Sequence, residues 1–156
     1  MTSDFPKAFD LIVGVEGGYT NDPRDRGGET KYGISKRAYP DLDILNLTVD
    51  QAKAIYRRDY WDACKCDQLP APLDIFVFDA AVNQGVGAAV KTLQRLIGVP
   101  VDGIVGPVTL GTASKMKREM AMLYMADRAL QYTDMDQFGL YGRGWLKRLF
   151  TVAREA

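Results

Sequence analysis

The sequence predicts a mainly α-helical fold that packs as one compact body. Apolar residues recur with helical spacing along most of the chain, and no segment shows the strict alternation of a half-buried strand. The length of 156 residues corresponds to about one domain and is sufficient for a core of its own. We expect two regions, 1–87 and 88–156, packed against each other, because the connection near Gly85–Ala88 is too short and apolar for a flexible linker.

The first predicted helix runs from about Asp4 to Val15. Pro6 falls in its first turn, where the missing N–H costs little, and Gly17–Gly18 is expected to end it. The following residues, 19–35, are rich in turn formers and have room for a short hairpin.

Further helices follow in the rest of the chain. Thr48 and Gln51 form a capping box that opens a helix continuing through residue 61. The segment PLDIFVFDAAVNQG, residues 72–85, is apolar on nearly all sides, which places its helix at the centre of the fold. The remaining expected elements are a helix at 87–98, a turn-rich segment at 99–107, a long helix at 108–132 opened by Pro107, and a short helix around 145–153.

Composition and charge exclude several classes of function. With 20 basic and 20 acidic residues, the formal net charge of zero argues against nucleic acid as the main partner. The chain has no histidine, which excludes Ser-His-Asp and Cys-His catalysis and His-ligated metals. Cys64 and Cys66 alone cannot close a zinc site, and a bridge between them would be strained, so we interpret them as reduced thiols. No metal or cofactor is expected.

Glu16 stands at the end of an apolar stripe. Counted from Phe9, the side chains of Ile12, Val13 and Glu16 fall at helical spacings of +3, +4 and +7. Apolar neighbours and a helix C-terminus both disfavour a charged carboxylate, so the pKa of Glu16 should rise towards neutrality, as a general acid requires. The alternative is that Glu16 pairs with an arginine or caps loop N–H groups.

The loop after the glycines adds polar and aromatic groups suited to a sugar. Two carboxylates on either side of a glycosidic bond are the minimum equipment for its hydrolysis. The alternative for the segment NDPRDRGG is a solvated turn. The candidates are the carboxylates of Asp22, Asp25 and Glu29, the hydroxyl of Thr30, which could hold a water, and the rings of Tyr19 and Tyr32.

The stretch EGGYTNDPRDRGGETKYGIS, residues 16–35, resembles the signature of the glycoside hydrolase family 108 lysozymes. These are phage-type endolysins (N-acetylmuramidases) that cleave the bond from N-acetylmuramic acid to N-acetylglucosamine in peptidoglycan. The resemblance implies a lysozyme-like helical fold with Glu16 as the catalytic acid. By analogy with phage lysozymes, Asp25 would stabilise the oxocarbenium-like state or orient water, although Thr30 stands one residue closer to Asp25 than in their pattern.

Two further stretches extend the resemblance. DAAVNQG, residues 79–85, is similar to a family segment, and Asn83 could bind an N-acetyl or hydroxyl group of the substrate. Alternatively, Asp79 and Asn83 satisfy each other inside the core. LQRLIGVPVDGIVGPVTL, residues 93–110, together with GRGWLKRL resembles a peptidoglycan-binding region, so 1–87 would be catalytic and 88–156 would bind the wall. The V-D-G-I-x-G-P core could instead be only a turn.

Some groups in the second half have simpler interpretations. A cationic surface would help on an anionic wall, although a solvated helix face is the plainer reading of its basic residues. The helical spacing of Met116, Met120, Leu123 and Tyr124 indicates core positions. Core packing is also expected for Trp61 and Trp145, with sugar stacking as the alternative. The basic residues are Lys115, Lys117, Arg118, Arg128, Arg143, Lys147 and Arg148.

The sequence-based hypothesis is therefore an N-acetylmuramidase in which Glu16, Asp25 and Thr30 are catalytic and Tyr19, Tyr32 and Asn83 bind substrate. Retention or inversion of the anomeric configuration stays open. The alternatives are a lytic transglycosylase, a non-catalytic wall-binding module and, more remotely, a DNA-associated protein. We expect a monomer. Because the N-terminus shows no signal-peptide pattern, we also expect the protein to be made in the bacterial cytoplasm and to reach the periplasmic wall with a holin-type membrane partner.

Overall fold

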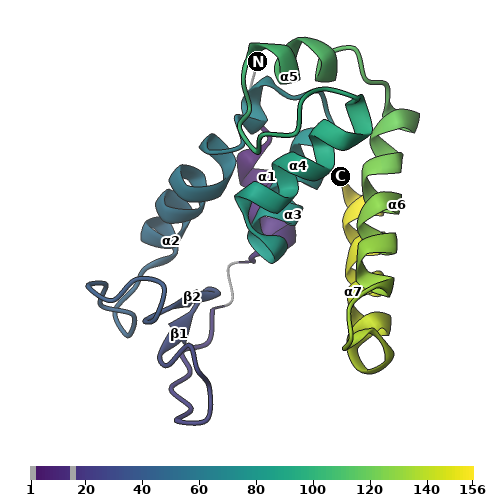
Figure 1. Ribbon diagram of the computed structural model, residues 1–156. Coiled ribbons are helices and arrows are strands. Elements are labelled where there is room, and N and C mark those ends of the chain that lie inside the picture. The colour runs from purple at the N-terminus through teal and green to yellow at the C-terminus, as the bar shows by residue number, and fades with distance from the viewer. Residues whose placement is uncertain (1–2, 15–16) are drawn as a thin grey trace.

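In the computed structural model, which describes residues 3–14 and 17–156, helices pack around a central helix α3 (Leu73–Gln84). Figure 1 shows α3 and α4 (Val86–Ile97) in the middle, with α2 (Val49–Tyr56) on one side and the antiparallel pair α6 (Arg118–Thr133) and α7 (Phe138–Glu155) on the other. The predicted mainly α fold in a single body is confirmed. The other elements are α1 (Phe5–Ile12), β1 (Thr30–Lys31), β2 (Ile34–Ser35) and α5 (Pro107–Ala113).

Helix α3 is buried because its sequence is apolar on nearly every side. All residues from 73 to 81 are buried, and α3 contacts α1, α4, α6 and α7. Phe78 packs edge-on against Trp61, with ring centroids 5.4 Å apart, and against Phe5, at 5.8 Å. The expected central position of this helix and the core position of Trp61 are both confirmed. None of the described helices is long and apolar enough to cross a membrane.

Helix α1 ends earlier than predicted. The N–H groups of Val13 and Gly14 both donate to the Phe9 carbonyl at 2.9 Å, and Gly14 has a φ of +77°, which glycine adopts without steric cost. Gly14, rather than Gly17–Gly18, therefore ends the helix. Phe9 is buried, as the apolar stripe predicted, but α1 ends before the stripe can continue along it to position 16. Val15 and Glu16 themselves lie outside the described residues.

The start of α2 is confirmed by its capping box. The Thr48 side chain accepts a hydrogen bond from the Gln51 N–H at 3.2 Å, and the Gln51 side chain accepts from the Thr48 N–H at 2.9 Å. The chain then continues as a π-helix over Arg57–Asp62, which places Trp61 in the core.

The single long helix expected at 108–132 is wrong, because the chain breaks between α5 and α6. At the break the Ser114 hydroxyl donates to the Gly111 carbonyl at 2.9 Å, Met116 is buried, and Lys117 is extended with φ −91° and ψ 165°. The last helix is in turn longer than expected, since α7 begins at Phe138.

This break corrects the expected methionine stripe. Met116 belongs to the turn, so its spacing to residues of α6 does not follow one helix. Met120 and Leu123 are 46% and 51% exposed, whereas Tyr124 is fully buried. Helix α6 therefore turns a different face to the core than continuous spacing predicts.

The V-D-G-I-x-G-P segment is a turn held by the buried Gln94. The Gln94 amide donates to the Asp102 carboxylate at 2.8 Å and to the Ile104 carbonyl at 3.0 Å, and its oxygen accepts from the Gly103 N–H at 2.9 Å. The alternative interpretation of this segment as a turn is therefore correct for its local structure. Wall binding by residues 88–156, and the division at residue 87, stay predictions.

A buried carboxylate ties α3 to α6 and α7. Asp79, which is fully buried, accepts hydrogen bonds from Arg128 on one oxygen and from Arg148 Nε and Nη2 on the other, the latter at 3.2 and 3.0 Å. The remaining donors of Arg128 reach Gln84 and the Tyr132 hydroxyl, both at 3.0 Å. A solvated position for Arg128 is therefore wrong, because Asp79 compensates its charge in the core. The exposed basic residues of the same set are Lys115, Lys117, Arg118, Arg143 and Lys147.

Asp74 in the first turn of α3 is a second buried carboxylate, and it has no basic partner within the described residues. Burial raises the pKa of Asp74 to about 6, the nearby Asp4 carboxylate adds to the rise, and the Ile75 N–H opposes it with a hydrogen bond at 2.8 Å. The charged form is therefore costly at neutral pH.

Replacing Arg128 with Met should lower the free energy of unfolding by about 3 kcal/mol, because a buried carboxylate loses its most enclosed partner. Urea denaturation measures this change. Arg118→Met, at an exposed position on the same helix, should change stability by less than about 0.5 kcal/mol. Equal effects of the two substitutions would contradict the structural role of the pair.

Replacing Asp74 with Asn should remove a pH dependence of stability. Because the pKa is raised in the folded protein to about 6 from 3.8, the stability that the carboxyl contributes is complete below about pH 4 and is lost as the pH rises through 6. At pH 8 the Asn variant should be more stable than wild type by about 1 kcal/mol, with little difference at pH 4. Thermal melts at both pH values test this, with the exposed Asp10→Asn as control.

Candidate active site

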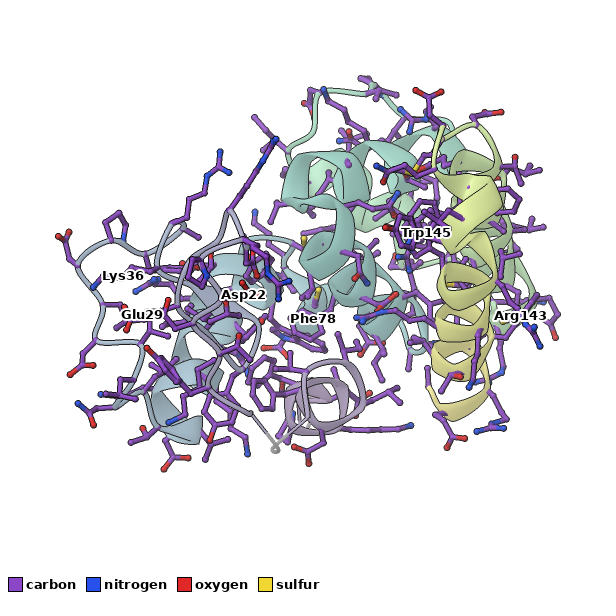
Figure 2. The ribbon with its side chains drawn as sticks, turned by 90° about the horizontal axis from the view of Figure 1, so that it is seen from below. Asp22, Glu29, Lys36, Phe78, Arg143 and Trp145 are labelled. Atoms are coloured by element: carbon purple, nitrogen blue, oxygen red, sulfur yellow. The ribbon has the colours of Figure 1, made fainter. Side chains whose placement is uncertain are left out.

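A cavity of about 210 Å³ lies where the end of α1, the hairpin, α2 with its π-helical extension, α3 and α7 meet. Its lining is mostly aromatic and aliphatic, with one amide and one guanidinium among the described residues. Figure 2 shows the molecule from below. Asp22 and Glu29 lie on one side of Phe78, and Trp145 of α7 lies on the other side. The cavity is lined by Ile12, Val13, Tyr32, Gly33, Tyr56, Tyr60, Val82, Asn83 and Arg148.

The hairpin expected within residues 19–35 is present, and its turn enters the cavity. Lys31 of β1 pairs with Ile34 of β2, leaving Tyr32 and Gly33 as a two-residue turn. Both turn residues have positive φ, +50° and +73°, as a type I′ turn requires. The left-handed conformation costs a non-glycine residue about 1 kcal/mol. The hydroxyl of Tyr56 stabilises the turn by donating to the Tyr32 carbonyl at 2.8 Å.

Glycines allow the tyrosines to approach the backbone closely. A Cβ atom at Gly17 would lie 2.2 Å from Cδ1 of Tyr32, so the Tyr32 ring packs directly on the Gly17 backbone. A Cβ atom at Gly33 would lie 2.6 Å from the Tyr56 hydroxyl oxygen. Larger residues at either position would displace a ring that lines the cavity.

Tyr56 and Tyr60 form the aromatic wall of the cavity. Their rings stack with centroids 5.4 Å apart and an interplanar angle of 29°. Burial raises the pKa of Tyr56 to about 12, the adjacent Tyr60 adds to this, and the positive charge of Arg148 opposes it. Tyr56 is therefore a neutral hydrogen-bond donor at any physiological pH.

The candidate second carboxylates lie on the loop before β1 and do not line the cavity. One Asp25 oxygen accepts from the Gly27 N–H at 2.8 Å, as in an Asx turn. Asp22 binds the Arg24 side chain, and Glu29 accepts from the Tyr19 hydroxyl at 2.6 Å. Asp25 thus lies in a turn, as the turn-forming residues of NDPRDRGG predicted. Its catalytic role stays a prediction.

Thr30 and Tyr19 are also held by contacts within this loop. The Thr30 hydroxyl donates to the Gly28 carbonyl at 3.3 Å, and its backbone pairs with Thr20 and Ser35. Tyr19 is half-buried and its hydroxyl is engaged by Glu29. Of the predicted site residues that the structure describes, it brings Tyr32 and Asn83 together in the cavity and leaves Tyr19, Asp25 and Thr30 outside its lining.

Asn83 makes the expected contact with Asp79, and its role in substrate binding stays a prediction. Its amide donates to the carbonyl and the carboxylate of Asp79, at 2.9 and 3.1 Å, and the residue also lines the cavity. The bond to Asp79 fixes the amide plane, while the exposed side remains available to a ligand. Asn83 can therefore act as a rigid hydrogen-bonding group.

Sequence reasoning did not single out Tyr56, Tyr60 or Arg148 as site residues. The two tyrosines were detectable in principle as an aromatic pair at i, i+4 on a predicted helix. Arg148 was not, because its partner Asp79 is 69 positions away and only the packing of α7 on α3 brings them together.

Glu16, the predicted acid, lies outside the described residues, but its sequence neighbours border the cavity. Val13 lines it, and Gly17 packs against the ring of Tyr32. Within residues 3–14 and 17–156, no group of three or more Cys, Asp and Glu side chains is arranged to hold a metal ion.

Comparison with known proteins identifies the family of the chain. The family model for Glycosyl hydrolase 108 matches residues 9–85, which include all the lining residues except Arg148. The solved structure of SagA from Brucella abortus is 32% identical, covers 97% of this chain and 92% of its own, and superimposes with a TM-score of 0.83. A comparison with curated proteins found no match.

The chain therefore belongs to the glycosyl hydrolase 108 family, and it is a glycoside hydrolase. The structural match also confirms the lysozyme-like helical fold predicted from the sequence.

Replacing Gly17 with Ala should reduce glycan cleavage by about tenfold or more, because the added methyl displaces the Tyr32 ring from the cavity wall. Rates of fragment release from purified peptidoglycan measure the effect. Gly18→Ala is the matched control, since a Cβ at Gly18 meets nothing within 4 Å. Equal activity of the two variants would show that the packing of Tyr32 on Gly17 does not matter for activity.

Proposed function

We propose that this glycoside hydrolase is an N-acetylmuramidase that cleaves the β-1,4 linkage from N-acetylmuramic acid to N-acetylglucosamine in peptidoglycan, with Glu16 as the general acid. The observation that supports this most is the tyrosine-lined cavity bordered by residues on both sides of Glu16 in the sequence. Family membership and the likeness to SagA support the same reaction class.

In the proposed reaction, the Glu16 carboxyl gives its proton to the bridging oxygen as the bond from C1 to that oxygen breaks. A water then adds at C1 and gives its proton to a carboxylate of the site, so the products are two shorter glycans. Tyr32 would provide a flat face for a sugar ring, and Asn83 would bind an N-acetyl or hydroxyl group. Tyr56 keeps its proton and holds the Tyr32 turn in place.

Asp25 is the proposed second carboxylate, and Thr30 would position the water. Asp25 is exposed, and one of its oxygens is engaged by the Gly27 N–H. This geometry also favours a second candidate function, a lytic transglycosylase, which needs one acid and no attacking water. In that reaction the C6 hydroxyl of the muramic acid attacks its own C1 and leaves a 1,6-anhydro end.

The expected holin-type partner, the monomeric state, the phage role and action in the periplasm stay predictions. The same is true of wall binding by residues 88–156.

Replacing Glu16 with Gln should lower the rate of glycan cleavage by at least about 100-fold, because the amide cannot supply the proton. Mass spectrometry of fragments released from purified peptidoglycan gives both the rate and the product. A reducing muramic acid end supports hydrolysis, and a 1,6-anhydro end supports the transglycosylase. Glu119→Gln, at an exposed position on α6, is the control and should behave as wild type.

Undiminished cleavage by the Glu16 variant would exclude Glu16 as the acid. A wild-type protein that binds peptidoglycan but releases no fragments would instead indicate a non-catalytic wall-binding module.

A further inference from the structure

The ion cluster beneath the cavity contains more positive than negative charge. One carboxylate, that of Asp79, faces the two guanidinium groups of Arg128 and Arg148. The side chain of Arg128 is 1% exposed, whereas that of Arg148 is 39% exposed. The uncompensated charge within the described residues therefore lies with Arg148.

Arg148 presents this charge to the candidate active site. It lines the cavity and is the only charged residue among the described residues that do so. Arg148 lines the cavity together with Tyr56 and Tyr60, and its positive charge lowers the pKa of Tyr56 against the larger effect of burial. An anionic group bound in the cavity would therefore face the positive charge of Arg148 and no other charged side chain of the described lining.

The guanidinium is oriented before any ligand arrives. Arg148 has five N–H donors, and Asp79 engages Nε and Nη2 through a single oxygen. Asp79 is in turn fixed by Arg128 and by the Asn83 amide. The Nη1 group donates to none of the described residues, so it is available for an acceptor in the cavity. A group held in this way loses little conformational entropy on binding.

The chemistry of the proposed substrate indicates which acceptor this is. Of the two alternating sugars, only muramic acid carries a lactyl ether with a carboxyl group. That group is a carboxylate where the stem peptide has been removed, and an amide where the peptide is attached. A guanidinium binds a carboxylate more strongly than a neutral carbonyl, because both partners of the hydrogen bond are charged.

We propose that Arg148 is a substrate-binding residue that donates to the lactyl carboxyl group of a muramic acid bound in the cavity, and that it makes the enzyme prefer glycan strands without stem peptides. This inference rests on the proposed action on peptidoglycan. It gives α7, which lies outside the matched family segment, a direct part in recognising the substrate.

A purely structural role for Arg148 is the alternative, because the same side chain joins α7 to α3. The two roles differ in which substrates a substitution of Arg148 would affect. A structural arginine affects all substrates alike, whereas a binding arginine affects only those with the charged lactyl group.

The test uses two strands of identical length that differ only in this group. Glycan strands freed of peptides by an amidase carry the lactyl carboxylate, and treatment with carbodiimide and ammonia converts it into the neutral amide. Wild type should have a KM about tenfold lower for the carboxylate strand. Arg148→Gln should raise the KM for that strand about tenfold, with little change for the amide strand and in kcat.

Lys147→Gln is the matched control. Lys147 is the neighbouring cation on α7 and is exposed. It lines an adjoining hollow between α1 and α7, which Arg148 also borders, but it does not line the cavity itself. This variant should keep the wild-type preference. Equal KM values of wild type for the two strands would overturn the proposal, even if the Arg148 variant did not fold. An equal effect of Arg148→Gln on both strands would also overturn it and assign Arg148 a structural role.

Calorimetric binding of the same two strands to Glu16→Gln protein, with and without Arg148→Gln, repeats the comparison without cleavage. A missing preference in binding contradicts the role of Arg148. A preference in binding by a wild-type protein that cleaves neither strand contradicts the proposed enzymatic function and leaves the binding role supported.

Discussion

The structure depends on one buried carboxylate. Asp79 stands in the most apolar helix of the protein, where an unpaired charge would cost several kcal/mol, so α6 and α7 must bring their arginines to it. The pairing sets how the α6–α7 hairpin packs on α3. It also holds the Asn83 amide and the Arg148 guanidinium in the wall of the cavity. A single interaction thus determines both the packing of the C-terminal helices and the polar part of the candidate active site.

In the wall of the cavity, two tyrosine side chains pack directly against glycine backbone. The Tyr32 ring occupies the space that a side chain at position 17 would take, and the Tyr56 hydroxyl occupies the corresponding space at Gly33. The strain of a tyrosine at positive φ is offset by the hydrogen bond from Tyr56. Gly17, Tyr32 and Gly33 of the family 108 signature therefore have a packing role in the wall of the cavity.

The parts of the fold that could be predicted are those determined by local sequence. The all-apolar stretch that forms α3 and the capping box of Thr48 needed no knowledge of distant residues. The break before α6 was missed because Ser114 and the buried Met116 interrupt a segment that otherwise reads as helix. The early end of α1 was missed because Gly14 looked like one more helical residue until its φ was known.

The candidate site was predictable to a similar degree. Tyr32 and Asn83 came from a motif and both line the cavity, but spacing alone could not show that Asp25 engages its own loop. Arg148 required the tertiary pairing with Asp79 to be visible at all.

The π-helix that follows α2 carries a consequence for how the enzyme can vary. A π-turn contains one residue more than an α-turn, and such insertions often occur beside functional sites. Removing one residue from Arg57–Asp62 would restore regular winding and change the position of Tyr60 relative to Tyr56, whose ring it now stacks on. The length of this segment, and not only its composition, therefore helps to shape the aromatic wall, and a deletion here would reshape the cavity without replacing any residue that lines it.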